Sequence, residues 1–253
     1  MPLVSTPEVV LSTIRYGETS KIVRLATRDY GVQSVIAKGA LRPRSRFGAA
    51  MQLLSLGQAH IIISERRDLQ ILTAFDLTRL HVALARDMDR YAAASALAEV
   101  TMRFAPADPH PEIYQFLHLA LAQLEEAPEH EVPALGIKLL WGLAGILGFA
   151  PSLEDCARDG APVVADGPMA FSAEDGGALC ARCAGETKSA RLPASDRADL
   201  EVLLSDNDAV PTLDERHAAA HRRLVTRYIR YHLGEGAELP GLEFWCARSW
   251  SAA

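Results

Sequence analysis

Short runs of aliphatic and β-branched residues, separated by turn residues, fill the first part of the chain. The runs are Val9–Ile14, Lys21–Thr27, Val32–Lys38, Leu53–Ile63 and Leu69–Ala74. In the second run Val23 and Leu25 share one face of the predicted strand, while Arg24 lies on the other. Five short strands within about 75 residues predict a small closed β-barrel of the oligonucleotide-binding (OB) type.

The apolar spacing changes from strand-like to helical at Arg86. Helices are predicted over 86–104, 112–126, 133–148, 200–204 and 213–233. Residues 150–187 are rich in Gly, Pro and Asp and are expected to be irregular. We therefore predict an α+β protein. An OB-type barrel domain over 1–80 is followed by a helical domain over 81–253, into which a zinc-ribbon-like Cys loop over 150–187 is inserted.

Composition narrows the class of protein. Of the 253 residues, 49% are hydrophobic and 23% charged, which is too apolar for a disordered chain. The most apolar segment, Leu135–Ala150, is shorter than a membrane span and contains Lys138, so we expect a buried helix. No signal-peptide pattern is visible, and four cysteines are too few for a disulfide scaffold. These features predict a cytoplasmic, nucleoid-associated protein with no membrane partner.

Charge is distributed unevenly along the chain. Residues 1–80 hold 11 Lys/Arg and 6 Asp/Glu, whereas 81–253 hold 15 and 26, although the whole chain carries −6. Such asymmetry favours a binding face on the basic half. The excess is densest between Arg15 and Arg46, a window that includes Lys21 and Arg24.

The loop predicted between the third and fourth strands carries the most suggestive chemistry. It runs from Lys38 to Gly48 and combines four cations with two glycines, a proline and an aromatic residue. Such cations neutralise phosphates, and an aromatic ring can stack on a base. The candidate DNA-binding residues are Lys21, Arg24, Lys38, Arg42, Arg44, Arg46 and Phe47. A solvated polar loop, with Phe47 in the barrel core, is the alternative interpretation.

Three ordered motifs in this half resemble the bacterial RecO family of DNA repair and recombination mediators. They are the stretch Val9–Val23, the sequence Thr27-Arg28-Asp29-Tyr30-Gly31 and the stretch Ala37–Gly48. The resemblance implies binding of single- and double-stranded DNA and annealing of complementary strands. It also implies cooperation with RecR, contact with the C-terminal tail of the single-stranded-DNA-binding protein SSB, and indirect help in loading RecA during recombinational repair of DNA damage, the RecFOR pathway.

The cysteines form an incomplete zinc motif. Cys180-Ala181-Arg182-Cys183 has the spacing of half a zinc knuckle, and Cys156 offers a third thiolate. Where many members of the family resemble C-x2-C-G, this chain has Asp159. Three thiolates and one carboxylate can still hold a single structural Zn²⁺. A metal-free loop and a disulfide remain alternatives. Cys246 is a spare candidate ligand, although its position suits a buried apolar residue.

No sequence motif points to catalysis. The chain has no phosphate-binding G-x-x-x-x-G-K-[ST], no G-x-S-x-G and no H-E-x-x-H, so we expect no nucleotide cofactor and no enzymatic activity. His217 and His221 are four residues apart and are interpreted as a surface pair on one helix. Two further hypotheses are an RNA-binding OB-barrel protein and a protein-binding zinc-ribbon scaffold.

Two groups of cations in the helical half are candidates for binding an acidic partner segment. One is Lys138 beside an apolar run. The other consists of Arg222, Arg223, Arg227 and Arg230. The arginines are spaced to share one helix face, and the same face could instead extend a DNA path.

Overall fold

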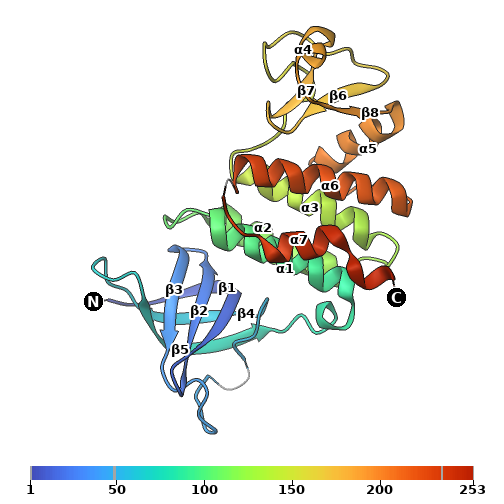
Figure 1. Ribbon diagram of the computed structural model, residues 1–253. Helices are drawn as coiled ribbons and strands as arrows, with labels where there is room; N and C mark the ends of the chain where they lie inside the picture. Colours follow the sequence, from blue (N-terminus) through green and yellow to red (C-terminus); the bar gives the residue numbers. More distant parts are fainter. Residues whose placement is uncertain (1, 48–49, 235, 253) are drawn as a thin grey trace. The chain divides into compact units, whose positions relative to one another are not determined.

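The computed structural model describes residues 2–47, 50–234 and 236–252 (Figure 1). The chain forms two compact units, one up to Glu126 and one from Ala127. Gly48, the last residue of the predicted basic loop, lies outside the described residues.

The first unit contains a closed five-stranded barrel with strand order β1-β2-β3-β5-β4. Its strands are β1 (Leu3–Tyr16), β2 (Ser20–Thr27), β3 (Gly31–Ala37), β4 (Leu56–Ile62) and β5 (Gln70–Arg79). Neighbouring strands are antiparallel except β3 and β5, which are parallel. This arrangement fits an OB fold and confirms the barrel expected from the sequence.

Strand β1 closes the barrel because it pairs with strands on both of its edges. Its first half pairs with β4, from Leu3 opposite Ile62 to Val9 opposite Leu56. Its second half pairs with β2, and the register shifts between Val10 and Ser12. The strand therefore begins six residues before the predicted start at Val9, since pairing with β4 extends it through Pro7.

Aliphatic side chains from every strand fill the barrel. The buried cluster comprises Val10, Val23, Leu25, Val35, Ala37, Ala40, Phe47, Met51, Ala59, Ile61, Leu72 and Phe75. Three of its members, Ala40, Phe47 and Met51, come from the connection between β3 and β4. That connection is therefore anchored in the core at several points.

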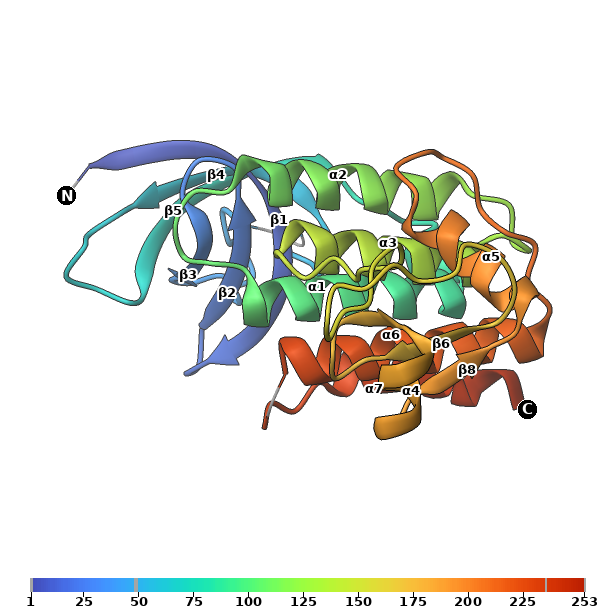
Figure 2. The same cartoon turned by 90° about the horizontal axis from the view of Figure 1, so that it is seen from above.

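Two helices complete this unit. The helices α1 (Met88–Phe104) and α2 (Pro111–Glu126) run beside each other and contact β1 and β2 (Figure 2), and the short 3₁₀ helix η1 (Leu84–Arg86) precedes them. At Gly31, where φ is +65°, a Cβ would lie 2.3 Å from the carbonyl oxygen of Asp108 in the α1–α2 loop. Only glycine allows this turn to approach the loop so closely. Helices α1 and α2 share this compact unit with the barrel, and the predicted domain boundary at residue 80 precedes them in the chain.

The second unit combines helices with a small sheet. Its helices are α3 (Val132–Ile146), α4 (Ala181–Glu186), α5 (Ala194–Leu204), α6 (Glu215–His232), α7 (Pro240–Ala247) and the 3₁₀ helix η2 (Ser249–Ala252). Its strands, in the order β7-β6-β8, are β6 (Met169–Ser172), β7 (Gly177–Leu179) and β8 (Ala190–Leu192). Helix α3 packs against α5 and α6, and α6 packs against α7.

The segment predicted to be irregular is in fact partly ordered. Residues 150–187 contain the β6–β7 hairpin and α4, which the sequence analysis did not predict because these elements are only three to six residues long. Gly177 lets the segment at Ser152 pair closely with β7, since a Cβ at Gly177 would lie 2.1 Å from the carbonyl oxygen of Ser152.

An aromatic cluster ties this sheet to the helices of the second unit. The ring of Trp141 in α3 lies 6.2 Å from that of Phe171 in β6 and 4.9 Å from that of Tyr228 in α6, both edge-to-face.

Among the described residues, no helix has both the length and the apolar character needed to cross a bilayer.

One buried carboxyl group is unusual in the barrel. Glu8 of β1 is 0% exposed, and among the described residues neither of its side-chain oxygens has a hydrogen-bond partner. Burial raises the pKa of Glu8 well above its usual value. In the unfolded chain the group ionises near pH ~4.3. Its contribution to stability is therefore complete below that pH and is lost as the pH rises through the folded-state pKa.

We predict that Glu8→Gln has a higher free energy of unfolding than wild type at pH 7. At that pH the buried carboxyl group must either hold a proton or carry a charge in the core, and both cost free energy. The neutral amide avoids both costs. The difference should shrink at up to about 1.4 kcal/mol per pH unit as the pH falls, and vanish near pH ~4. Urea unfolding followed by circular dichroism measures this difference. Glu18→Gln, on an exposed residue, is the matched control. A stability gain that does not change with pH would contradict the interpretation.

Candidate nucleic-acid interface and metal centre

The connection between β3 and β4 folds as consecutive turns whose ends are fixed to the barrel. Backbone N–H groups of Ala40, Arg42 and Ser45 donate to the carbonyl oxygens three residues earlier, over 3.0–3.3 Å. Phe47 is only 2% exposed and lies in the barrel core. The structure thus favours the core alternative for Phe47, because a ring so deeply buried cannot receive a stacked base.

The cations of this connection lie at the surface. Lys38, Arg42, Arg44 and Arg46 are all exposed, and none of them forms an ion pair within the residues that the structure describes. Arg46 places its guanidinium carbon 5.2 Å from the centre of the Phe47 ring, which holds that side chain against the barrel. We call these four side chains the loop cations.

The other two predicted binding residues have structural partners. The Lys21 ammonium donates to the carbonyl oxygen of Met51 over 3.3 Å, which fastens the connection to β2. Arg24 donates to Ser34 Oγ over 2.8 Å and to the carbonyl oxygen of Met102 in α1 over 3.2 Å. Burial, and then the charge of Arg103, lower the pKa of Arg24. Arg24 therefore lies in the packing between barrel and helix and does not join the loop cations.

The tip of the β1–β2 hairpin lies beside the loop cations. The backbone N–H of Leu41 donates to the carbonyl oxygen of Thr19 over 2.8 Å. Next to this bond the hairpin presents Arg15 and Tyr16, and Tyr16 is 52% exposed. The sequence analysis did not select Tyr16, although its position at the end of a strand, within the basic window, was a usable signal. The edge formed by the hairpin tip and the loop cations is the candidate nucleic-acid interface.

The two groups of cations predicted to bind an acidic partner segment differ in whether their charges are available to a partner. Lys138 donates to the carbonyl oxygens of Val202 and Ser205 over 2.9 and 2.8 Å, so it caps the end of α5 and does not form a surface lip. Arg222 is 3% exposed and bonds Glu215 over 2.9 Å.

The other three arginines of this predicted group, Arg223, Arg227 and Arg230, are exposed. Arg227 pairs with Glu174 over 3.4 Å and Arg230 with Glu243 over 2.6 Å. The four arginines therefore do not share one face, because a buried position falls among the exposed ones.

The predicted metal ligands do come together. One donor atom from each of Cys156, Asp159, Cys180 and Cys183 lies within 4.8 Å of the others, and the cysteines are free thiols. The Sγ atom of Cys183 lies 3.1 Å from Asp159 Oδ2, and that of Cys180 lies 3.6 Å from the same oxygen. These four residues, the cysteine cluster, are a donor set that could hold a metal ion.

Hydrogen bonds to Asp159 set the electrostatics of this cluster. Asp159 accepts the backbone N–H of Ala161 over 3.0 Å and a guanidinium N–H of Arg182 over 2.6 Å. These two bonds and the thiol donors lower the pKa of Asp159. The bond to the same carboxylate, followed by burial, raises the pKa of Cys183 to about 12.

Cys156 behaves differently. Burial alone would raise its pKa, but backbone donors at Cys180, Arg158 and Asp159 together bring it below the usual thiol value. A bound cation would lower all the thiol pKa values further, since metal ligation requires the thiolate.

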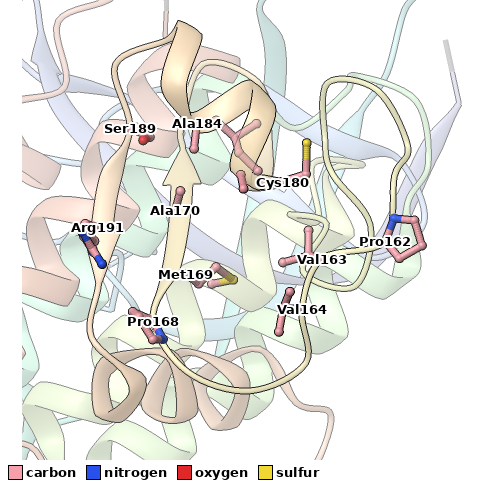
Figure 3. Close-up of a pocket in the computed structure, with 12 residues that line it drawn as sticks. Pro162, Val163, Val164, Pro168, Met169, Ala170, Cys180, Ala184, Ser189 and Arg191 are labelled. Atoms are coloured by element: carbon pink, nitrogen blue, oxygen red, sulfur yellow. The ribbon is translucent and has the colours of Figure 1, made fainter.

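A cavity of about 460 Å³ opens beside the cluster (Figure 3). Its lining is mainly apolar and includes Val163, Met169 and Ala170, with Arg191 the charged residue among those lining it. Cys180 forms part of the same wall, so the cluster can be reached from this cavity.

Two family models match consecutive parts of the chain. The family model described as Recombination protein O N terminal matches residues 1–81, and the one described as Recombination protein O C terminal matches residues 85–239.

Proteins named "DNA repair protein RecO" are similar over most of their length. That of Anaeromyxobacter dehalogenans (strain 2CP-C) is 34% identical over 92% of this chain and 93% of its own. Those of Rubrobacter xylanophilus and Thermobifida fusca (strain YX) are 33% and 31% identical, over 92% and 93% of this chain and 92% and 96% of their own. This chain therefore belongs to the RecO family of DNA repair proteins.

Proposed function

We propose that this protein is a recombination mediator that binds single- and double-stranded DNA through the barrel edge and anneals complementary strands. The observation that carries the proposal is that the loop cations are exposed and outside the ion pairs of the described chain, beside an exposed tyrosine. Cations without carboxylate partners are free to replace counterions on a phosphate backbone. An exposed aromatic ring next to them can stack on an unpaired base.

Annealing needs no catalytic chemistry in this proposal. Two complementary strands repel each other through their phosphates, and cations that neutralise one strand reduce that repulsion. Base pairing then supplies the free energy. We accordingly propose that the protein is not an enzyme and uses no nucleotide cofactor.

The proposed partners follow from family membership. With RecR, the protein would help load RecA onto single-stranded DNA covered by SSB, in the cytoplasm. An acidic SSB tail would need exposed cations on the acidic half of the chain. Arg223, Arg227 and Arg230 are such cations, since surface ion pairs of the kind made by Arg227 and Arg230 are weak and exchangeable. Lys138 is not, because α5 occupies its ammonium group.

A structural Zn²⁺ in the cysteine cluster is part of the proposal. The donor set fits the ion, because three thiolates and one carboxylate oxygen can form a closed four-ligand site. Cys156, Asp159, Cys180 and Cys183 would hold the ion, which would cross-link the turn before β6 to the start of α4. Arg182 would remain as an outer partner of Asp159.

We predict that replacing Arg42, Arg44 and Arg46 together by Ala weakens binding to single-stranded DNA by about 100-fold at 0.1 M salt, because three phosphate contacts are lost. Fluorescence anisotropy with several unrelated sequences should give the same loss for each. Arg28→Ala, an exposed barrel arginine already paired with Asp29, should bind like wild type. Unchanged affinity in the triple variant would exclude the barrel edge as the main contact. An RNA strand that outcompetes DNA of the same sequence would favour the RNA-binding alternative.

The same assay separates the two aromatic residues. Tyr16→Ala should weaken binding to single-stranded DNA by about 1–3 kcal/mol and affect duplex binding less, because only unpaired bases can stack. Tyr16→Phe should retain the affinity. Phe47→Leu should lower the unfolding free energy while leaving DNA affinity intact, since its ring is in the core. Equal binding by Tyr16→Ala and wild type would show that the edge acts through charge alone.

We predict at least one zinc ion per chain after purification without chelator, measured by elemental analysis. Cys180→Ser should lower that content by about one ion per chain, and Asp159→Cys should slow removal of zinc by a competing chelator, because thiolate is the softer donor. Cys246→Ser, outside the cluster, is the control and should keep the ion. Wild-type protein that contains no zinc would contradict the zinc proposal. The role of Asp159 would then be limited to its hydrogen bonds with Arg182 and Ala161.

A further inference from the structure

A second group of metal-binding side chains lies where α5 meets α6, apart from the cysteine cluster. One donor atom from each of Asp196, Asp199 and His221 lies within 4.8 Å of the other two. Asp196 and Asp199 are three residues apart on α5, so both carboxylates project from one face of that helix. His217 and His221 are four residues apart and share a face of α6 in the same way.

The side chain of His221 has no partner for either ring nitrogen. The residue is 2% exposed, and among the described residues neither Nδ1 nor Nε2 forms a hydrogen bond. Asp196 is 9% exposed, and its Oδ1 atom likewise has no hydrogen bond. Buried polar groups in native proteins are almost always satisfied. Unpartnered nitrogen and oxygen donors therefore lie within 4.8 Å of one another, as the ligands of a metal ion do.

His217 lies next to this group, in contact with Asp196. Its Nε2 atom lies 3.6 Å from Asp196 Oδ1, while its Nδ1 atom lies 2.7 Å from a carboxylate oxygen of Asp214. Asp214 is also the N-cap of α6, so its position is fixed by the helix. A carboxylate bonded to the far nitrogen of a ligating histidine is the usual device for orienting the ring.

We propose that Asp196, Asp199, His217 and His221 form a binding site for a divalent transition-metal ion of the zinc or cobalt class. Two imidazole nitrogens and two carboxylate oxygens make a harder donor set than the cysteine cluster, so the two sites differ in the ions they prefer. The ion would link the first two turns of α5 to α6. A cavity of about 300 Å³ opens onto the site, and its lining includes Arg191, Arg223 and Arg227 as well as Asp196 and His221.

The proposal is tested on the full chain by stripping metal with a chelator and titrating with Co²⁺ in equilibrium dialysis. The wild type should bind two ions, and the double variant Asp199→Asn, His217→Ala should bind one. The ultraviolet charge-transfer absorption of thiolate-bound cobalt should be the same in both proteins, because the cysteine cluster is unchanged. His130→Ala, an exposed histidine of the same unit, is the control and should bind two ions.

A second measurement isolates the new site. In the variant Cys180→Ser, Cys183→Ser, one Co²⁺ should still bind, without thiolate absorption, and adding His217→Ala should weaken it at least tenfold. The proposal is overturned if the wild type binds only the thiolate-coordinated ion. It is equally overturned if the loss of Asp199 and His217 leaves the stoichiometry and affinity unchanged.

Discussion

Closure of the barrel by β1 is the constraint on which the candidate DNA interface depends. A single strand of 14 residues pairs with β4 through its first half and with β2 through its second. The β1–β2 turn is therefore brought beside the connection that leaves β3, and the bond between Leu41 and Thr19 joins them. Phe47 and Met51 anchor that connection in the core. The cations of that connection consequently lie at the surface, and the exposed Tyr16 lies next to them.

The chain uses its cations in distinct ways, and their environments separate the roles. Arg24 and Lys138 donate hydrogen bonds to backbone carbonyl oxygens, so these two cations stabilise the packing of the fold. Arg227 and Arg230 form exposed ion pairs, which a charged partner can replace at small cost. The loop cations form no ion pair within the described residues, so their charge is available to a ligand. The barrel edge therefore differs from α6 less in the number of its basic residues than in whether those residues already have acidic partners.

Much of this organisation was predictable from local patterns. Strand alternation gave the barrel, and C-x2-C spacing with Asp159 gave the cysteine cluster. Properties that depend on packing were not predictable in this way. Neighbouring arginines do not distinguish Phe47 in the core from Tyr16 at the surface, because both aromatic residues lie beside arginines. Helical spacing paired His217 with His221, but only the packing of α5 on α6 buries His221 among carboxylates. The β6–β7 hairpin was missed because its strands are very short and its glycines are also typical of irregular loops.

The central claim is that the barrel edge binds DNA through its phosphates. The most direct test is the affinity of the full-length wild-type chain for single-stranded DNA across a salt series. If the loop cations each displace a counterion, the logarithm of the association constant should fall linearly with the logarithm of salt concentration, with a slope of about −3. An affinity that does not change with salt would contradict the claim, because it would mean that phosphate neutralisation contributes nothing to binding.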